Sequence, residues 1–397
     1  MSTDVLARQP ASIHQLGRAL DTAVDKARAN LPDMLRQPST WSVATDGDYT
    51  KWDEDFFAIG NWTNGFFAGM GVLAWQRSGD DFFLKQLEAL EPLFQAKLEG
   101  ENAKNTMHDL GFLYSPYAVA LFKKTGDTRW RDLALKAADI LAGRFIENGG
   151  YFRAWGRMDE IGTDYDGLAI IDCLMNMPLL HWASTEAGNP KYHDLAVRHT
   201  DTTLERFVRN DWSVYHSFRF DLETGKPARP DNYCGYHPES HWARGTTWAM
   251  YGFALAYRHT GDLQYLHASQ NITRKFISCL DEETIPVWDF RLSPDSDLLR
   301  DSSAAAIAAC AIQELEDLEA ADAEMIGVKH QLIDRMLSPD YFNADPAVRG
   351  FLKHGEIGDG ADEARHFYRA KNAYTSWGDY YLMEALGREL GLTVNWW

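Results

Sequence analysis

Hydrophobic residues recur along the opening segment with the spacing of an amphipathic helix. Apolar side chains three or four positions apart share one helical face, and here they are Ile13, Leu16, Leu20, Val24, Ala27 and Leu31. A second run repeats this spacing at Trp130, Leu133, Ala134, Ala137 and Leu141. Because such a stripe packs against a core, we predict that the opening segment is the first outer helix of a helical fold.

Four helical runs end in a glycine that is followed by Asp or Asn. These turns are Gly79-Asp80, Gly126-Asp127, Gly188-Asn189 and Gly261-Asp262. Glycine readily adopts the left-handed conformation that ends a helix, and an Asp or Asn side chain can cap the start of the next one. Each turn therefore predicts a helical hairpin.

The hairpins recur along the chain, which indicates a repeat architecture. Two weaker units, around residues 302–319 and 377–392, bring the number of hairpins to six. Six hairpins that close on themselves form an (α/α)6 barrel, a six-hairpin toroid, and an open superhelix is the alternative. Several helical runs begin with aromatic residues, which favours convergence on a shared pit. No linker-like segment interrupts the chain, so residues 1–397 are predicted to form a single domain.

One stretch has the alternation of a β-strand. Its two faces are Trp212, Val214, His216, Phe218 and Phe220 on one side and Ser213, Tyr215, Ser217 and Arg219 on the other. A turn at residues 223–226 would fold it back on the next segment. We therefore predict a short β-hairpin inserted in a loop of an otherwise all-α fold.

Composition and charge narrow the classes of function. The chain has 397 residues and a net charge of −19, which argues against nucleic acid as a partner. No stretch is long and apolar enough to span a bilayer, so no membrane partner is expected. Residues Met1–Arg8 lack a secretory signal and the four cysteines form no CxxC pair, and both features predict a cytoplasmic location. The oligomeric state has no signature in the sequence.

Motifs for cofactors and metals are missing from the sequence. It contains no glycine-rich phosphate loop, no GxSxG elbow and no HExxH helix. His237 and His241 are four residues apart, but Pro238 lies between them and no third ligand is evident. We therefore expect no cofactor and no metal, and we interpret this stretch as an exposed loop.

Two aspartates stand in apolar surroundings. Asp109 heads an apolar helical run, and Asp172 lies among apolar residues in the segment 170–177. A buried carboxyl group is costly unless it is paired, hydrogen-bonded or protonated, and a protonated one can serve as a general acid. A helix N-cap would also explain Asp109, and a structural hydrogen bond would also explain Asp172. Their sequence context alone leaves both alternatives open.

Tryptophans supply a second clue to the chemistry. Four of the 14 stand beside glycines and polar residues near predicted helix starts: Trp62, Trp155, Trp242 and Trp377. An indole face packs well on the C–H face of a sugar ring while its N–H can still donate a hydrogen bond. A single tryptophan usually belongs to a core, but four in such settings favour a saccharide-binding pit.

Seven segments occur in the order of a known family. They are WTNGF at 62–66, HDLGFLYS at 108–115, IIDCLMN at 170–176, YHSF at 215–218, WARG at 242–245, RDSSA at 300–304 and WGDYY at 377–381. With these, the chain from about Trp62 to Glu384 resembles glycoside hydrolase family 88, the unsaturated glucuronyl hydrolases. The resemblance implies an (α/α)6 barrel without a metal that acts on unsaturated oligosaccharides left by polysaccharide lyases.

The resemblance also implies the reaction, which is hydration of the C4=C5 vinyl ether of a nonreducing-end unsaturated uronic acid. Asp172 would protonate C4 and activate a water toward C5, after which the hemiketal opens and the other sugar leaves. Asp109 would stabilise the oxocarbenium-like charge. Two close carboxyl groups raise each other's pKa, which would help to keep Asp172 protonated.

Further residues are implied to bind the unsaturated uronyl substrate: Trp62, His108, Trp155, His216, Arg244, Trp248 and Trp377. His216 and Arg244 would lie at the unsaturated ring, with Arg244 near its carboxylate. A histidine satisfied within its hairpin and an arginine paired with a neighbouring acid are the alternatives for these two residues.

The chain departs from the family pattern at several positions. Cys234 stands where relatives carry Gln, Thr246 replaces another Gln, and Asn64 replaces Asp. Residues 351–368 are also atypical, so neither the linkage nor the sulfation preference is carried over. Three rival functions stay open: an unsaturated rhamnogalacturonyl hydrolase of the same fold, an (α/α)6 sugar 2-epimerase that uses His216 or His241 as a base, and a noncatalytic saccharide-binding protein.

Overall fold

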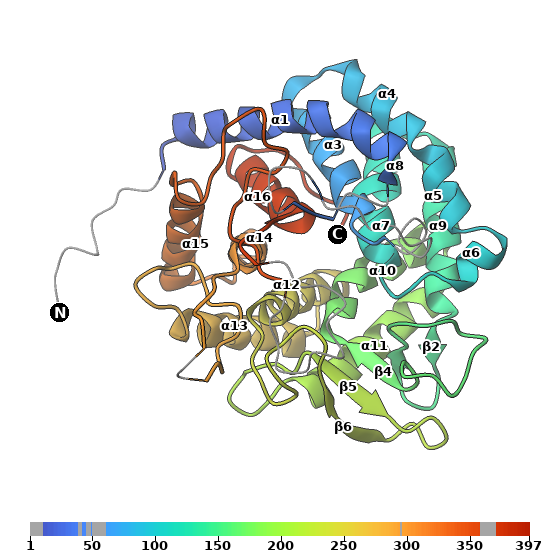
Figure 1. Cartoon of the computed structure of the whole chain (residues 1–397). Coiled ribbons are helices and arrows are strands. Elements are labelled where there is room, and N and C mark those ends of the chain that lie inside the picture. The colour runs from blue at the N-terminus through green and yellow to red at the C-terminus, as the bar shows by residue number, and fades with distance from the viewer. Residues whose placement is uncertain (1–10, 39–41, 45–48, 50–60, 294–295, 358–370) are drawn as a thin grey trace.

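Helices form a closed double ring in the computed structural model, which describes residues 11–38, 42–44, 49, 61–293, 296–357 and 371–397 (Figure 1). An inner ring is surrounded by an outer one, which is the arrangement of an (α/α)6 barrel. The predicted all-α fold class and the closed six-hairpin toroid are therefore confirmed, and the open superhelix is wrong.

The inner ring is built from helices that are buried on nearly all sides, as expected for helices with neighbours all round. They are α3 (Asn64–Ser78), α7 (Leu110–Tyr114) with the π-helix η2 (Ser115–Val119) and α8 (Ala120–Thr125), the 3₁₀-helix η3 (Ile171–Asn176) with α10 (Met177–Ala187), α12 (Ala243–Thr260), α14 (Ser302–Asp317) and α16 (Ser376–Glu389).

The outer ring consists mainly of amphipathic helices that bury one face against the inner ring. They are α1 (Ile13–Arg36), α4 (Asp81–Ala89) with the short α5 (Glu91–Lys97) and α6 (Gly100–Lys104), α9 (Thr128–Ala142), α11 (Pro190–Phe207), α13 (Leu263–Ser278) and α15 (Ala323–Met336). Helix α1 is the outer helix that was predicted from its apolar stripe.

The four predicted glycine turns all connect an inner helix to the next outer helix. Gly79, Gly126, Gly188 and Gly261 adopt φ values of 67°, 72°, 61° and 72°. The side chain of the residue after each glycine accepts the N–H of the residue two positions on, at 2.8 to 3.2 Å. The fifth hairpin lacks this signal, because the residue that follows α14 is Leu318 rather than glycine, and α15 is capped by Asp322 four positions later.

The predicted β-hairpin exists, although its first strand is shorter than expected. Strand β5 (Ser217–Phe220) pairs antiparallel with β6 (Pro227–Asp231), whereas Trp212 has a φ of 64° and lies outside the strand. A strand that was not predicted, β4 (Leu168–Ile170), pairs with the other edge of β5. Because β4 runs directly into η3, this sheet positions Asp172.

Short strand pairs complete the ring. Strands β2 (Phe145–Ile146) and β3 (Tyr151–Phe152) form a small hairpin, while β1 (Val43–Ala44) pairs with β7 (Tyr374–Thr375) across the ends of the chain. Helix α1 packs against both α3 and α16, so the last hairpin meets the first. In the described part of the chain, no helix combines the length and apolar character needed to cross a membrane.

Candidate active site

The first catalytic candidate, Asp109, precedes the inner helix α7. It occupies the N-cap position, but its side chain makes no capping hydrogen bond. The N-cap alternative therefore does not explain this residue. Its side chain is instead buried beside that of His108, whose Nε2 lies 3.5 Å from Asp109 Oδ1.

The second candidate, Asp172, lies in the first turn of η3, which is packed directly against α7. Asn176 locks the two helices together, because its Oδ1 accepts the N–H of Phe112 at 2.7 Å and its Nδ2 donates to the carbonyl of Asp172 at 3.3 Å. Gly111 permits this approach, since a Cβ at that position would lie 2.4 Å from the Cα of Asn176. The lock brings the two aspartates together.

The two carboxyl groups form an electrostatically coupled pair. Burial, followed by the charge of Asp172, raises the pKa of Asp109 to about 8, against the opposing effect of Arg144. Burial also raises the pKa of Asp172, to about 6. Among the described residues, Asp172 Oδ2 has no hydrogen-bond partner. A pair with these two pKa values shares one proton near neutral pH.

The order of the two pKa values differs from the expectation that the proton rests on Asp172. Three groups support the charged form of Asp172 and lower its pKa: first the positive charge of Arg244, then the backbone N–H of Asp172 itself, and to a smaller extent the indole of Trp248, whose N–H does not reach full hydrogen-bond geometry. In the substrate-free chain, the higher pKa therefore belongs to Asp109.

His216 is a neutral histidine with a defined tautomer. Its Nδ1 lies 3.1 and 3.2 Å from the backbone N–H groups of Tyr233 and Cys234, and 3.2 Å from Asn232 Oδ1. Two donors against one acceptor favour the tautomer that carries its proton on Nε2. Burial lowers the pKa of the ring to about 3. The ring also packs edge-on against Trp242, at 4.6 Å between centroids. His216 can therefore donate a hydrogen bond through Nε2, but at this pKa it is a poor proton acceptor.

Arg244 is held by the ion pair that the sequence analysis named as its alternative. Its Nη1 donates to Asp301 Oδ2 at 2.6 Å, and the guanidinium also donates to the carbonyls of Glu356 and Ile357. The central carbon of the guanidinium, Cζ, lies over the rings of Trp242 and Trp377, 4.5 and 5.3 Å from their centroids. The charge nevertheless reaches the site, because it lowers the pKa of both Asp172 and His216.

The predicted aromatic residues divide into two groups by exposure. Trp62 and Trp155 are partly exposed, and Trp62 stacks on the buried Trp377 at 5.1 Å between centroids. Trp248 is fully buried, packs on Phe112 at 5.1 Å between centroids and lies near enough to Asp172 to lower its pKa. His108 is also buried, and burial lowers its pKa well below the usual value.

Two expectations about polar residues are corrected by the structure. His241 does not lie in an exposed loop, because it is 1% exposed and its ring packs on Phe290 at 5.0 Å. Thr246 is also buried and donates to the carbonyl of Trp242 at 2.9 Å, which removes it from the set of pit-lining polar groups. Cys234, by contrast, stays close enough to Asp172 and Arg244 for both charges to affect its thiol. Much of the atypical segment 351–368 lies outside the described residues.

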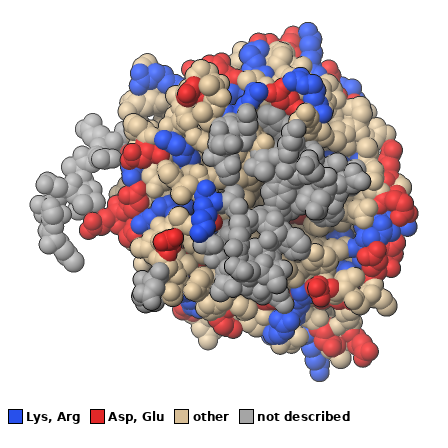
Figure 2. Space-filling view, viewed as in Figure 1, with Lys and Arg blue, Asp and Glu red and all other residues tan. Residues whose placement is uncertain are grey.

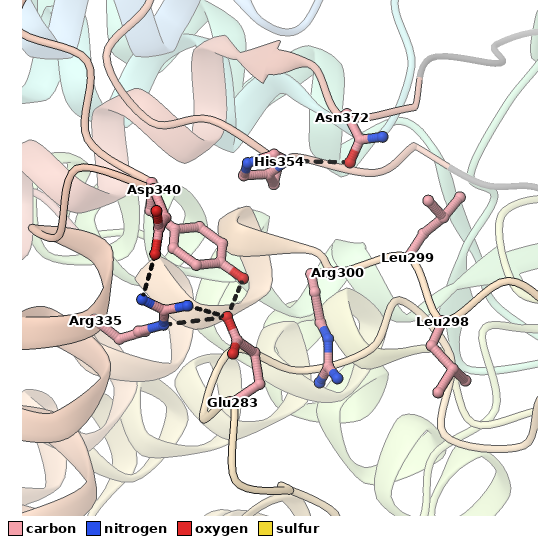
Figure 3. A pocket seen from close by; sticks show the side chains of 9 residues that line it. Glu283, Leu298, Leu299, Arg300, Arg335, Asp340, His354 and Asn372 are labelled. Atoms are coloured by element: carbon pink, nitrogen blue, oxygen red, sulfur yellow. Dashed lines mark hydrogen bonds and ion pairs between the residues drawn. The ribbon is translucent and has the colours of Figure 1, made fainter.

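On the face that Figure 2 shows, the charges of the described residues are interspersed, with no broad field of one sign in view. A separate pocket of about 260 Å³ is drawn in Figure 3, and Arg335 in its wall is held by Glu283 and Asp340. Neither aspartate lines it. No group of three His, Cys, Asp or Glu in the described part of the chain could hold a metal ion.

Sequence reasoning missed three residues that organise the site. Asp301 anchors Arg244, Asn176 joins the two helices, and Arg144 influences Asp109. Asp301 could have been noticed as the N-cap of α14, where its Oδ1 accepts the N–H of Ser303 at 3.0 Å. Asn176 and Arg144 have no local signal, since their partners are distant in sequence.

The chain belongs to glycoside hydrolase family 88, because the sequence model of Glycosyl Hydrolase Family 88 matches residues 30–334. It is therefore a glycoside hydrolase. An unsaturated chondroitin disaccharide hydrolase of Streptococcus pyogenes serotype M1 is 35% identical over 387 residues, which cover 95% of this chain and 92% of that protein.

Solved structures of unsaturated glucuronyl hydrolases share the fold. The enzyme of Bacillus sp. GL1, described as responsible for the degradation of glycosaminoglycan, superposes with a TM-score of 0.85 at 32% identity, covering 96% of this chain and 99% of that one. A variant of the Streptococcus agalactiae enzyme complexed with dGlcA-GalNAc6S superposes with a TM-score of 0.79 at 28% identity, covering 99% and 96%. The family predicted from the seven segments is confirmed.

Proposed function

We propose that Asp109 and Asp172 act as a proton-sharing pair in the release of a nonreducing-end 4,5-unsaturated uronic acid, which is the reaction of this family. The observation that carries the proposal is the contact between α7 and η3, which brings the buried Asp109 and the partly exposed Asp172 close enough for the charge of Asp172 to raise the pKa of Asp109. Such a pair keeps one proton available near neutral pH while the other carboxyl group is charged.

The substrate itself would move the shared proton to Asp172. A uronate that enters the site adds a negative charge near Asp172, and a nearby negative charge raises the pKa of a carboxyl group. The proton then adds to C4, and positive charge develops on C5 and the ring oxygen. The carboxylate of Asp109 stabilises this charge.

Water completes the reaction at C5. The water adds to C5 and gives its proton to the Asp172 carboxylate, which restores the acid. The hemiketal opens to a ketone at C5, C1 becomes a hemiacetal, and the leaving sugar is released. The net change consumes one water and the ring alkene, and it requires no redox partner.

The exposure of each candidate side chain indicates whether it can contact the substrate. The partly exposed Trp62 and Trp155 offer indole faces to the sugar, and His216 donates its Nε2 proton to a substrate oxygen. Arg244 provides positive charge for the uronate from its fixed position on Asp301. The buried Trp248, Trp377 and His108 support these groups from behind. The tautomer and low pKa of His216 disfavour the role of a base in a 2-epimerase.

We propose a glycosaminoglycan-derived disaccharide as the substrate class. This proposal is supported by the relatives, one of which is named for chondroitin disaccharides and another of which was solved with dGlcA-GalNAc6S. A panel of unsaturated disaccharides, followed by loss of the alkene's ultraviolet absorbance, tests it. Faster turnover with a rhamnose leaving sugar would overturn the substrate class without affecting the roles of the two aspartates. The cytoplasmic location stays a prediction.

The roles of the aspartates are tested by isosteric amides. Asp172→Asn removes the proton donor, so kcat/KM should fall by about 10²–10⁴-fold, and Asp109→Asn should also lower it strongly. Glu314→Gln is the control, since Glu314 is also an acidic side chain of the inner ring and is fully buried, but it lies in the last turns of α14 and pairs with Arg388 at 2.9 Å. It should cost stability and leave the folded protein active. Undiminished turnover by folded Asp172→Asn would disprove the mechanism.

A further inference from the structure

Arg144 is a buried arginine whose hydrogen bonds to the described residues all go to the main chain. It follows the end of α9 and is 2% exposed. Its guanidinium donates to four carbonyls: Thr106 at 2.7 Å, Arg153 at 2.9 Å, Gly156 at 2.9 Å and Ala154 at 3.3 Å. Within the described residues, no ion pair joins it to a carboxylate. This is unusual, because a buried guanidinium is normally paired with an acid.

The four carbonyls belong to two segments that both reach the active site. Thr106 lies three residues before Asp109, while Arg153, Ala154 and Gly156 surround Trp155. The N–H of His108 also donates to the carbonyl of Ala154, at 3.0 Å, so the two segments are bonded to each other as well as to Arg144. The guanidinium therefore joins the backbone that carries a catalytic carboxyl group to the loop that carries a pit tryptophan.

The charge of Arg144 acts on the same carboxyl group. Arg144 lowers the pKa of Asp109, against burial and the charge of Asp172, which raise it. Burial lowers the pKa of Arg144 itself to about 10, so the guanidinium is still charged at neutral pH. Because no carboxylate pairs with Arg144 in the described residues, its field is available to Asp109 rather than cancelled locally.

Arg153 provides a contrast within the same loop. It too is buried and donates to main-chain carbonyls, those of Trp155 at 3.1 Å and Glu160 at 3.0 Å. Arg153 is, however, paired with Asp166 at 3.1 Å, and it does not contribute to the pKa of Asp109. The loop thus contains two buried arginines, of which Arg144 alone affects the catalytic carboxyl group.

We propose that Arg144 is a positioning residue for the hydration reaction. It fixes Asp109 opposite Asp172 through the main chain, and its unneutralised charge favours the carboxylate form of Asp109 when Asp172 carries the proton. This inference rests on the roles proposed above for the two aspartates. A neutral side chain at position 144 would leave the shared proton on Asp109 for more of the time, where it cannot reach C4.

The expected signature is a shift in the pH dependence of kcat/KM. The alkaline limb reports loss of the last proton from the pair, so removing a nearby positive charge should move this limb to higher pH, by about one unit. Because the proton is then held more tightly on Asp109, kcat should fall about tenfold. KM should change less, since Arg144 is not placed to touch the substrate.

The test compares Arg144→Gln with the control Arg153→Gln. The control should loosen the Trp155 loop and raise KM but leave the alkaline limb in place. Should Arg144→Gln fail to fold, Arg144→citrulline carries the test, because its urea keeps the shape and most of the donors without the charge. Circular dichroism checks the fold of each variant.

An alkaline limb that stays at its wild-type pH in a folded 144 variant would overturn the proposal, even if kcat is lowered. Equal shifts in the 144 and 153 variants would overturn it too. Failure of the inference is separable from failure of the mechanism: if Asp109→Asn and Asp172→Asn abolish turnover while the limb does not move, only the role of Arg144 is wrong. If Asp109→Asn keeps full activity, the mechanism itself is wrong.

Discussion

At the scale of single residues, the carboxyl pair is held at a cost to stability. Asp109 binds its proton more tightly in the folded chain than in the unfolded one, since burial and the charge of Asp172 raise its pKa from 3.8 to about 8. Folding therefore takes up protons between these values, and the contribution of Asp109 to stability falls as the pH rises through this window. The raised pKa of Asp109 therefore keeps a proton bound at neutral pH, and it lowers the stability of the folded chain at that pH.

Asp109→Asn should relieve this cost in a pH-dependent way. At about pH 8 to 9 the variant should be more stable than the wild type by roughly 1–3 kcal/mol, and the gain should vanish toward about pH 3, where the wild-type carboxyl group is protonated in both states. Thermal unfolding across this range measures the difference. Asp194→Asn, at an exposed position on α11, is the control and should change little at any pH. A destabilised Asp109→Asn at alkaline pH would contradict the argument.

At the scale of elements, the site depends on the close contact of α7 with η3. The contact needs glycine at position 111, since a Cβ would collide with the backbone of Asn176 at 2.4 Å. Its geometry is then fixed by the bond from the N–H of Phe112 to Asn176 Oδ1 at 2.7 Å. Both aspartates lie within four residues of this contact, so separating the helices separates the carboxyl groups.

Gly111→Ala should therefore lower kcat strongly and destabilise the fold by about 1–3 kcal/mol through overpacking. Gly327→Ala is a matched control in α15, because a Cβ there meets nothing within 4 Å. The control should keep its activity and gain about 0.5–1 kcal/mol from helix propensity. Steady-state kinetics and chemical unfolding of both variants provide the comparison. Normal kcat in Gly111→Ala would show that the spacing of the two helices is not critical.

At the scale of the whole molecule, the ring is closed and filled at its centre. The C-terminal end of the described chain lies inside the ring (Figure 1), where Trp397 is 2% exposed and its Nε1 donates to Glu384 at 2.9 Å. Its ring also stacks on Tyr381 at 6.2 Å and meets Phe112 edge-on at 6.4 Å. Trp397 thus connects α16 to the helix that follows Asp109.

Trp397→Ala should destabilise the protein by about 3–5 kcal/mol, because it leaves a large cavity where several inner helices meet. If residues 1–397 form the single domain that we predict, the loss should appear as one shifted calorimetric transition. Trp212→Ala, at a side chain that is 36% exposed, should shift it far less. Two resolved transitions in either protein would argue against a single domain.

Part of the fold and site could be predicted because the signals are local. The glycine turns at Gly79 and Gly126 are set by a left-handed residue and a cap within four positions, so they can be identified in an isolated segment. The seven ordered segments likewise identified the family and its two aspartates. Between α14 and α15 no glycine is followed by Asp or Asn, so the sequence predicted the boundary between these two helices less well than the others.

Amphipathic periodicity, capping and family motifs are properties of neighbouring residues, and by themselves they determined the helical hairpins, the closed ring of family 88 and the candidate aspartates. Only the tertiary structure decided which side chains meet and which charges are felt. Arg244 reaches Asp301 across 57 positions, β4 joins β5 across a helix pair, and Arg144, which follows α9, acts on Asp109, which precedes α7 at the other end of the same hairpin. The tertiary structure also decided which of the two carboxyl groups has the higher pKa, because burial and the distance between charges exist only once the chain has folded.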